Sequence, residues 1–419
     1  MKNKATVLVI NSRFPEINQL AGALAEESLL TRYIRPYANL GRIWERALAK
    51  LPLFGRAYVR TFGRRVMPVP LSAVHVKEVG IGLDFAMAIH TRLRFSSSWF
   101  RNLRKNLINR TEDVVAETGA DALFEERMVV ASWYCALPAF KKASQHGIIR
   151  VLNYPLAHHA FTRRYLQEEA DLEPAFRATL NSHDSPKWQV DRLDKEIELA
   201  NHILVGSSFA KETFLMEGVP AEKIEVIPYG ADTSLFKPAE CKIINHNQFN
   251  VIFVGQLSQR KGLSYLLRAY ERIHGPGTSL TLVGQLQDDG ESLMPWRYLY
   301  RHIPHVPRVE LARLYQQADV FVFPTLVEGM GLVVVEAMAS GLPVITTPNG
   351  PGDIVRDGLE GFLVPPRDVD ALANRLQRLK DDPVLRNIMA ENAHSRSQYF
   401  TWANYRETVL MRISSWLEE

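Results

Sequence analysis

Two glutamates eight residues apart, Glu328 and Glu336, stand out as candidates for chemistry in this 419-residue chain. They flank a glycine turn, Gly329-Met330-Gly331, that leads into the apolar residues 332–335. A pair of acids can hydrolyse a glycosidic bond when its carboxyl groups lie roughly 5–10 Å apart. Eight helical residues span about 12 Å, so the spacing disfavours a hydrolase pair.

The elements around this turn favour a different use of the two acids. Residues 320–323 read as a buried strand ended by Pro324, and residues 332–340 read as a helix ended by Gly341. A strand, a glycine turn and a helix start can hold a phosphate on backbone amides. Glu328 would then accept hydrogen bonds from the hydroxyls of a sugar, and Glu336 from the hydroxyls of a ribose. The alternative is an acid favoured near a helix N-terminus plus a surface glutamate.

Further motifs follow in a fixed order along the second half of the chain. They occupy residues 251–257, 260–262, 349–350, 353, 357–358, 361–365 and 368, after two earlier segments at 201–208 and 226–232. From about residue 190 to 400 the set resembles the retaining GT-B glycosyltransferases of family four. The resemblance implies an α/β fold with two Rossmann-like parallel-sheet domains facing a cleft. It also implies a nucleotide-diphosphate sugar as donor substrate, a hydroxyl acceptor, no cofactor and no required metal.

The same resemblance implies roles for individual residues. Glu328, Lys261 and His158 are expected to be catalytic, Lys261 by stabilising the departing diphosphate. Where the family has an arginine this chain has Gln256, which cannot supply charge, and Arg260 is the candidate to compensate. The expected donor-binding residues are Glu336, Gly255, Gln256, Arg260, Gly329, Met330, Gly331, Leu332, Val333 and Val306.

His158 follows the strand expected at 148–152, on a loop where α/β sites form. His159 is the second choice, and a loop histidine without a catalytic role is the alternative. Arg163 and Arg164 could meet an anionic acceptor or pair with acids one helical turn on, at positions 168 and 169.

Length and alternation of elements predict two domains. We expect an acceptor-side domain over 1–240, a nucleotide-sugar domain over 250–400, and a last helix over 401–419 that crosses back to the first domain. The strands are expected at 5–10, 120–124, 148–152, 202–206, 224–227, 250–254, 279–283, 319–323, 343–347 and 361–364.

Composition favours a cytoplasmic protein. No run of about 18 apolar residues could span a bilayer, and the residues before the first strand are too few for a signal peptide. Two cysteines far apart, Cys135 and Cys241, argue against a disulfide framework.

Basic residues are concentrated between positions 31 and 65 and alternate there with aromatic ones. This pattern suits the surface of an anionic membrane or a lipid-linked acceptor, and the alternative is a pair of surface helices with aromatics packed inward. The formal net charge of +4 argues against nucleic acid. The nine basic residues are Arg32, Arg35, Arg42, Arg46, Lys50, Arg56, Arg60, Arg64 and Arg65.

The sequence therefore predicts a retaining, metal-independent hexosyltransferase of polysaccharide, glycolipid or lipid-linked glycan synthesis. His302 and His305 are separated by Pro304 and make a poor metal pair. Two other functions stay open, a GT-B-fold nucleotide-sugar epimerase and a catalytically silent GT-B partner protein.

Overall fold

The computed structural model describes residues 6–51, 58, 62, 67, 68, 70–92, 98–180, 185–240, 248–288 and 290–419. The chain forms two compact units that are interleaved in sequence. The first unit contains residues 1–154, 186–204 and 405–419, and the second contains 155–185 and 205–404. The predicted domains meet at one boundary between residues 240 and 250, and that boundary stays a prediction.

The first of two parallel sheets has seven strands in the order β3-β2-β1-β4-β5-β6-β7. Strand β1 is fully buried between β2 and β4, as a central strand covered on both faces must be. The strands are β1 (Val7–Ile10), β2 (Leu30–Arg35), β3 (Val76–Glu78), β4 (Met128–Ser132), β5 (Ile149–Asn153), β6 (His202–Val205) and β7 (Ile224–Val226).

The second sheet has six strands in the order β10-β9-β8-β11-β12-β13. The order reverses between β8 and β11, and ligands of such folds bind outside the carboxyl ends of the strands at this reversal. The strands are β8 (Phe249–Val254), β9 (Thr278–Val283), β10 (Arg301–Ile303), β11 (Val320–Phe323), β12 (Val344–Thr346) and β13 (Gly361–Leu363).

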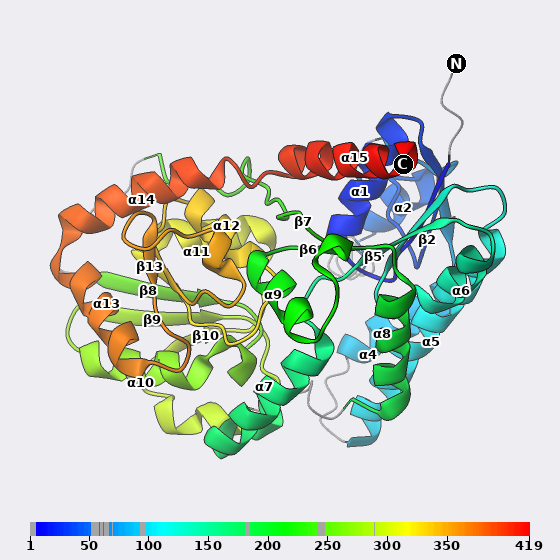
Figure 1. Cartoon of the computed structure of the whole chain (residues 1–419). Coiled ribbons are helices and arrows are strands. Elements are labelled where there is room, and N and C mark those ends of the chain that lie inside the picture. The colour runs from blue at the N-terminus through cyan, green and yellow to red at the C-terminus, as the bar shows by residue number, and fades with distance from the viewer. Residues whose placement is uncertain are drawn as a thin grey trace. The chain divides into compact units, whose positions relative to one another are not determined.

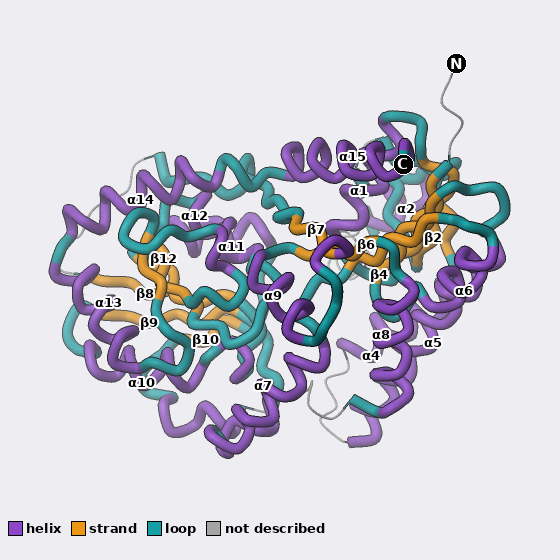
Figure 2. Tube along the Cα trace, viewed as in Figure 1, coloured by secondary structure: helices purple, strands orange, loops and turns teal. Residues whose placement is uncertain are grey.

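Helices connect the strands and cover the sheets (Figures 1 and 2). In the second unit α10 and α13 lie beside each other on one side of the sheet, with α12 and α14 on the other (Figure 1). The helices are α1 (Pro15–Glu26), α2 (Ile43–Ala49), α4 (Ile81–Arg92), α5 (Ser98–Ala122), α6 (Leu137–Gln145), α7 (His159–Leu172), α8 (Lys187–Leu199), α9 (Ser208–Met216), α10 (Leu263–Ile273), α11 (Arg308–Gln317), α12 (Leu332–Ala339), α13 (Val369–Asp381), α14 (Pro383–Ser397) and α15 (Trp402–Glu418).

Five short 3-10 helices complete the described elements. They are η2 (Pro174–Thr179), η3 (Ala221–Lys223), η4 (Gln259–Lys261), η5 (Glu291–Trp296) and η6 (Pro351–Asp353). Within the described part of the chain, none of the helices combines the length and apolar character needed to cross a bilayer.

The α/β fold with parallel sheets is confirmed, but one predicted strand is wrong. Residues 120–122 form the last turn of α5, and Phe124 just beyond it is exposed. The strand follows at β4, whose five residues are all buried. Ala120, Asp121 and Ala122 suit a helix better than a strand, which explains the error.

The described part of the basic segment is not helical throughout, and its contact with a membrane stays a prediction. It begins as strand β2, in which Tyr33 and Arg35 are buried. Tyr37, Tyr58 and Phe62 form a small buried cluster, so these aromatic rings pack inward. Helix α2 carries the exposed Arg46, and the exposed Lys50 directly follows it. Cys241 and four of the nine basic residues lie outside the described residues, namely Arg56, Arg60, Arg64 and Arg65.

Gly262 provides a test of how tightly the second unit is packed. It joins η4 to α10 with φ +71°, and a Cβ there would lie 1.9 Å from the carbonyl oxygen of Pro324. Gly358 has a similar φ of +78° with nothing within 4 Å of a Cβ. We expect Gly262→Ala to reduce the free energy of unfolding by about 2–4 kcal/mol and Gly358→Ala by about 1 kcal/mol. Denaturant unfolding measures both, and equal losses would contradict the close approach.

Candidate donor-binding site

The loop between β11 and α12, residues 324–331, is fixed at several points. The amide of Leu326 donates to the carbonyl of Arg260 at 2.9 Å, and Asn349 Nδ2 donates to the carbonyl of Leu326 at 2.8 Å. Thr347 Oγ1 donates to the carbonyl of Thr325 at 2.5 Å. This loop, called the acidic loop below because it carries Glu328, is therefore tied both to η4 and to the segment that follows β12.

Glu328 faces two cations of η4. Its Oε2 contacts the Lys261 ammonium and lies 3.3 Å from Nη1 of Arg260. Arg260 also donates to the carbonyl of Val327 at 2.8 Å, so its guanidinium is held against the acidic loop. A Cβ on Gly350 would lie 2.7 Å from Cβ of Glu328, so this glycine leaves room for the glutamate. The structure thus brings together the predicted Glu328, Lys261 and Arg260.

Lys261 is buried, and the Arg260 side chain is 19% exposed. Burial, followed by the nearby Arg260 charge, lowers the pKa of Lys261. Burial also lowers the pKa of Arg260 to about 10, which leaves the guanidinium charged at neutral pH. The Lys261 ammonium lies 4.9 Å from the centre of the Phe323 ring. The Glu328 carboxylate and this ring compensate the ammonium for the water it has lost.

The start of α12 adds backbone donors beside these charges. Gly331 precedes the helix with φ +90°, a conformation that glycine adopts readily. The first amides of any helix lack partners within it, so Leu332 and Val333 present donors there. Met330 is buried and its sulfur accepts from the amide of Tyr229 at 2.8 Å, so its side chain anchors the loop.

Glu336 lies one turn into α12 and is held by a residue that sequence reasoning missed. Nη2 of Arg308 lies 3.3 Å from its Oε1, and the Arg308 guanidinium lies 5.2 Å from the centre of the Phe236 ring. Burial raises the pKa of Glu336 to about 7, while Arg308 lowers it and Asp232 raises it further. Arg308 directly follows Pro307 at the start of α11, close in sequence to the predicted Val306.

The end of β8 has a tight backbone. Gly255 has φ +153°, and a Cβ on neighbouring Gly284 would lie 1.6 Å from the Gly255 carbonyl oxygen. Gln256 is exposed and Val306 is half-buried. These positions follow β8 and β10 in the second sheet, but their predicted contacts with a donor stay predictions.

His158 is buried at the start of α7, where Nδ1 accepts from the amide of Ala160 at 3.2 Å. Its ring stacks on His159 with centroids 4.4 Å apart. Burial, followed by the neighbouring His159 and Arg164, lowers the pKa of His158 to about 3, so the ring is neutral at physiological pH. The loop before it reaches the acidic loop, because a Cβ on Gly329 would lie 1.9 Å from the Pro155 carbonyl oxygen.

Of the two alternatives for Arg164, pairing with an acid of its own helix is not what the structure shows. Arg164 pairs with Glu217 at 2.8 Å, whereas Glu168 and Glu169 both pair with Arg367. Glu169 and its partner Gln259 are further residues that sequence reasoning missed. Glu169 falls beside the buried Leu166 and Ala170, and a charged residue on the apolar side of a helix was the available signal.

A separate cavity of about 270 Å³ lies in the first unit, where β1 and β2 end. Arg13, Asp84 and Glu112 line it together with Asn18 and Arg35. Arg13 is ion-paired with Glu112, so charges of both signs face the cavity. Among the described residues, no group of three or more His, Cys, Asp or Glu side chains is placed to hold a metal ion.

Comparisons with known proteins agree with this architecture. Residues 240–396 match the family Glycosyl transferases group 1. Sucrose-phosphate synthase from Thermosynechococcus elongatus superposes with a TM-score of 0.65 at 17% identity, covering 99% of this chain and all of that one. Anabaena HepE in complex with UDP-glucose gives 0.64 at 17% identity, covering 98% of this chain and 100% of that one.

The chain has the GT-B fold. An Escherichia coli enzyme, UDP-Gal:alpha-D-GlcNAc-diphosphoundecaprenol alpha-1,3-galactosyltransferase, is 33% identical over 195 residues, or 42% of this chain and 49% of that enzyme. The chain spans about half the length of the first curated relatives it matches. Together the comparisons support the GT-B glycosyltransferase superfamily.

Proposed function

We propose that this protein is a retaining, metal-independent glycosyltransferase of family four that moves a sugar from a nucleotide-diphosphate donor to a hydroxyl acceptor. The contact of Glu328 with Lys261 and Arg260 beside the start of α12 carries this proposal. A carboxylate that can accept hydrogen bonds from sugar hydroxyls, two cations and backbone donors thus lie in one small region of the second unit. A sugar diphosphate needs all three kinds of group.

The cations would stabilise the departing diphosphate. Lys261, Arg260 and the amides at the start of α12 can share its negative charge in a site with little water, where each interaction is strong. These fixed charges could supply the stabilisation that a metal ion supplies in other transferases. A diphosphate at this point would compete with Glu328 for the ammonium and leave the carboxylate to accept sugar hydroxyls.

The fate of the acceptor proton follows from the same pairing. With the donor bound, Glu328 accepts hydrogen bonds from the sugar hydroxyls and still faces Arg260, so its oxygens are occupied. The departing diphosphate is then the better acceptor of the proton, and attack occurs on the face that the leaving group leaves. Such front-face transfer retains the anomeric configuration, as the resemblance to family four implies.

The cavity of the first unit is our candidate for the acceptor. Its lining of paired guanidinium and carboxylate groups offers hydrogen-bond donors and acceptors at little net charge, which suits the hydroxyls of a sugar. The E. coli relative uses a UDP-sugar and a diphosphoundecaprenol-linked acceptor by its name. We therefore assign this chain to polysaccharide or lipid-linked glycan synthesis in the cytoplasm, with UDP-sugars as the first donors to test.

Single substitutions test the catalytic assignment. We expect Glu328→Gln and Lys261→Ala to lower kcat by about 100-fold or more, because each removes charge from the donor site. His158→Asn keeps an acceptor at the helix cap, so a loss of transfer there would assign the ring itself to the sugar. Glu310→Gln and Lys237→Ala, at side chains that are 47% and 58% exposed, are matched controls that should keep full transfer. Transfer at control level in Glu328→Gln or Lys261→Ala, measured as release of nucleoside diphosphate with acceptor, would refute the assignment.

The raised pKa of Glu336 makes donor binding depend on pH. A ribose hydroxyl donates to the ionised carboxylate, and protonation increases as the pH falls through about 7. We expect the Kd of the nucleotide sugar to rise about tenfold between pH 8 and pH 6. Glu336→Gln should bind weakly with little change over this range. A steep pH dependence that persists in Glu336→Gln would assign the effect to another group.

Peripheral membrane contact would involve helix α2. Its Ile43 and Trp44 are 81% and 44% exposed, beside the exposed Arg46. We expect the protein to sediment with anionic vesicles at low salt and to be released as salt rises. The double variant Ile43→Asp/Trp44→Asp should remain in the supernatant, whereas Val384→Asp, which changes an exposed residue of α14, should not alter sedimentation. Lack of sedimentation of the unmodified protein at low salt would remove the membrane proposal.

A further inference from the structure

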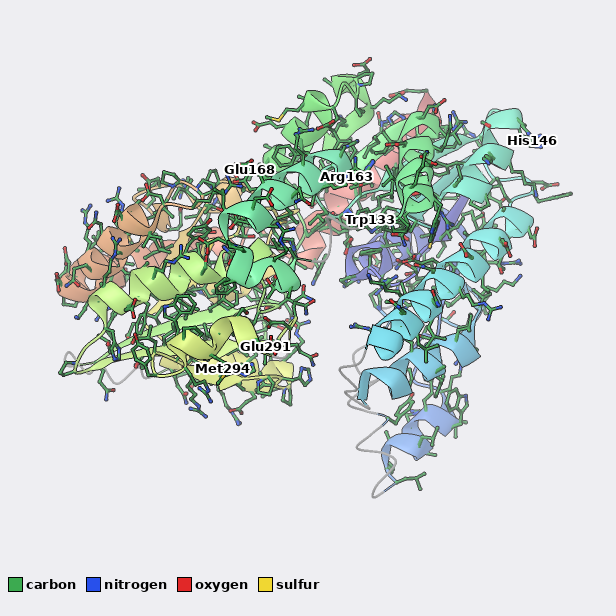
Figure 3. The ribbon with its side chains drawn as sticks, turned by 90° about the horizontal axis from the view of Figure 1, so that it is seen from below. Trp133, His146, Arg163, Glu168, Glu291 and Met294 are labelled. Carbon is green, nitrogen blue, oxygen red and sulfur yellow. The ribbon has the colours of Figure 1, made fainter. Side chains whose placement is uncertain are left out.

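A carboxylate buried in the second unit is connected to the cations of the donor site. Glu169 of α7 is fully buried and accepts three hydrogen bonds. Its Oε1 accepts from Nε2 of Gln259 at 2.7 Å and from the Tyr265 hydroxyl at 2.8 Å, and its Oε2 accepts from Nε of Arg367 at 2.8 Å. Figure 3 labels its neighbour Glu168 and Arg163 along the same helix.

Gln259 links Glu169 to the cations, because it bonds to Glu169 and directly precedes Arg260 and Lys261 in the chain. Its backbone amide donates to Oγ1 of Thr179 at 2.9 Å. Its side chain donates to Oγ of Ser264 at 2.7 Å and accepts from the amide of Ser264 at 3.1 Å. Both ends of the Gln259 side chain are therefore bonded, and η4 is held from Glu169 on one side and from α10 on the other.

The three donors around Glu169 require a carboxylate. A carboxylate brings no hydrogen, so it can accept from Gln259, Tyr265 and Arg367 at once. A glutamine would point one amide nitrogen at a donor and lose at least one of these bonds. Burial and the nearby Glu169 raise the pKa of Tyr265, so its hydroxyl keeps the proton that it donates. Arg367 supplies the counter-charge and adopts φ +70°.

The length of α7 explains why this contact concerns the donor site. His158 caps the first turn, close to the loop that meets Gly329, and Glu169 follows after eleven residues, about 16 Å along the helix. A single helix thus contacts the neighbourhood of the acidic loop at one end and η4 further along. Glu173, which directly follows α7, forms a bidentate ion pair with Arg268 of α10, with both hydrogen bonds at 2.6 Å.

We propose that Glu169 is a positioning residue for diphosphate binding, which acts through Gln259 to set where Arg260 and Lys261 present their charges. The inference rests on the proposed function, because the diphosphate is there the ligand of Lys261. Glu169 itself need not touch the donor. Its effect on binding should therefore depend on whether Lys261 is present.

Calorimetric titration of the full chain with UDP, GDP and ADP tests this dependence, using whichever nucleotide binds most tightly. We expect Glu169→Gln to weaken binding about tenfold, since a hydrogen bond to a charged group is lost. In the Lys261→Ala background the same change should weaken binding by clearly less than tenfold, because only Arg260 is left to be positioned and coupled residues are not additive. Glu168→Gln is the matched control, since the exposed Glu168 pairs with Arg367 at 2.7 Å and should leave Kd unchanged.

Tyr265→Phe gives a second, milder variant in case Glu169→Gln does not fold. It removes one donor to Glu169 and leaves Gln259 in place, and we expect it to weaken binding about threefold. Equal losses from Glu169→Gln with and without Lys261 would show a purely structural residue and overturn the inference. Unchanged binding in Glu169→Gln or Tyr265→Phe would also overturn it. Unchanged binding in Lys261→Ala alone would instead remove the diphosphate site on which both proposals rest.

Discussion

The second unit has to compensate two adjacent cations that are largely removed from water, Arg260 and Lys261. This requirement constrains where the surrounding segments can lie. A buried charge is costly unless it is paired and hydrogen-bonded. Glu328 supplies the opposite charge, the Val327 carbonyl accepts from Arg260, and the Phe323 ring faces Lys261. Because each of these partners belongs to β11 or the loop after it, η4 and the acidic loop have to be positioned together.

That requirement accounts for the close backbone approaches around the site. Gly262 allows η4 to meet Pro324, and Gly329 allows the acidic loop to meet Pro155. Gly350 makes room for Glu328 from a third segment. A side chain at any of these positions would meet the backbone or the side chain of a segment that forms the site. The glycines therefore contribute to the electrostatics of the site as well as to its packing.

Sequence reasoning succeeded where the signal was local. Strands β6 and β8 were predicted to within one residue at each end, because short apolar runs mark them clearly. Lys261 and Glu328 came from short motifs that each follow a buried strand, and the structure places their side chains in contact. Strand β2 was missed because Thr31 and Arg32 face solvent and interrupt its apolar pattern. The pairing of Glu169 with Gln259 joins residues 90 positions apart, a distance over which one sequence gives no pairing information.

The position of Arg260 bears on the missing positive charge at Gln256. From sequence, Arg260 was the candidate to supply the charge that Gln256 lacks. In the structure it is held by the Val327 carbonyl and by Glu328, and it stays charged at neutral pH although burial lowers its pKa to about 10. Its guanidinium therefore supplies a second positive charge beside Lys261 from η4 rather than from the end of β8. A diphosphate bound at the start of α12 would meet that charge on the side of the acidic loop, and this position makes Arg260 the residue best placed to compensate for Gln256.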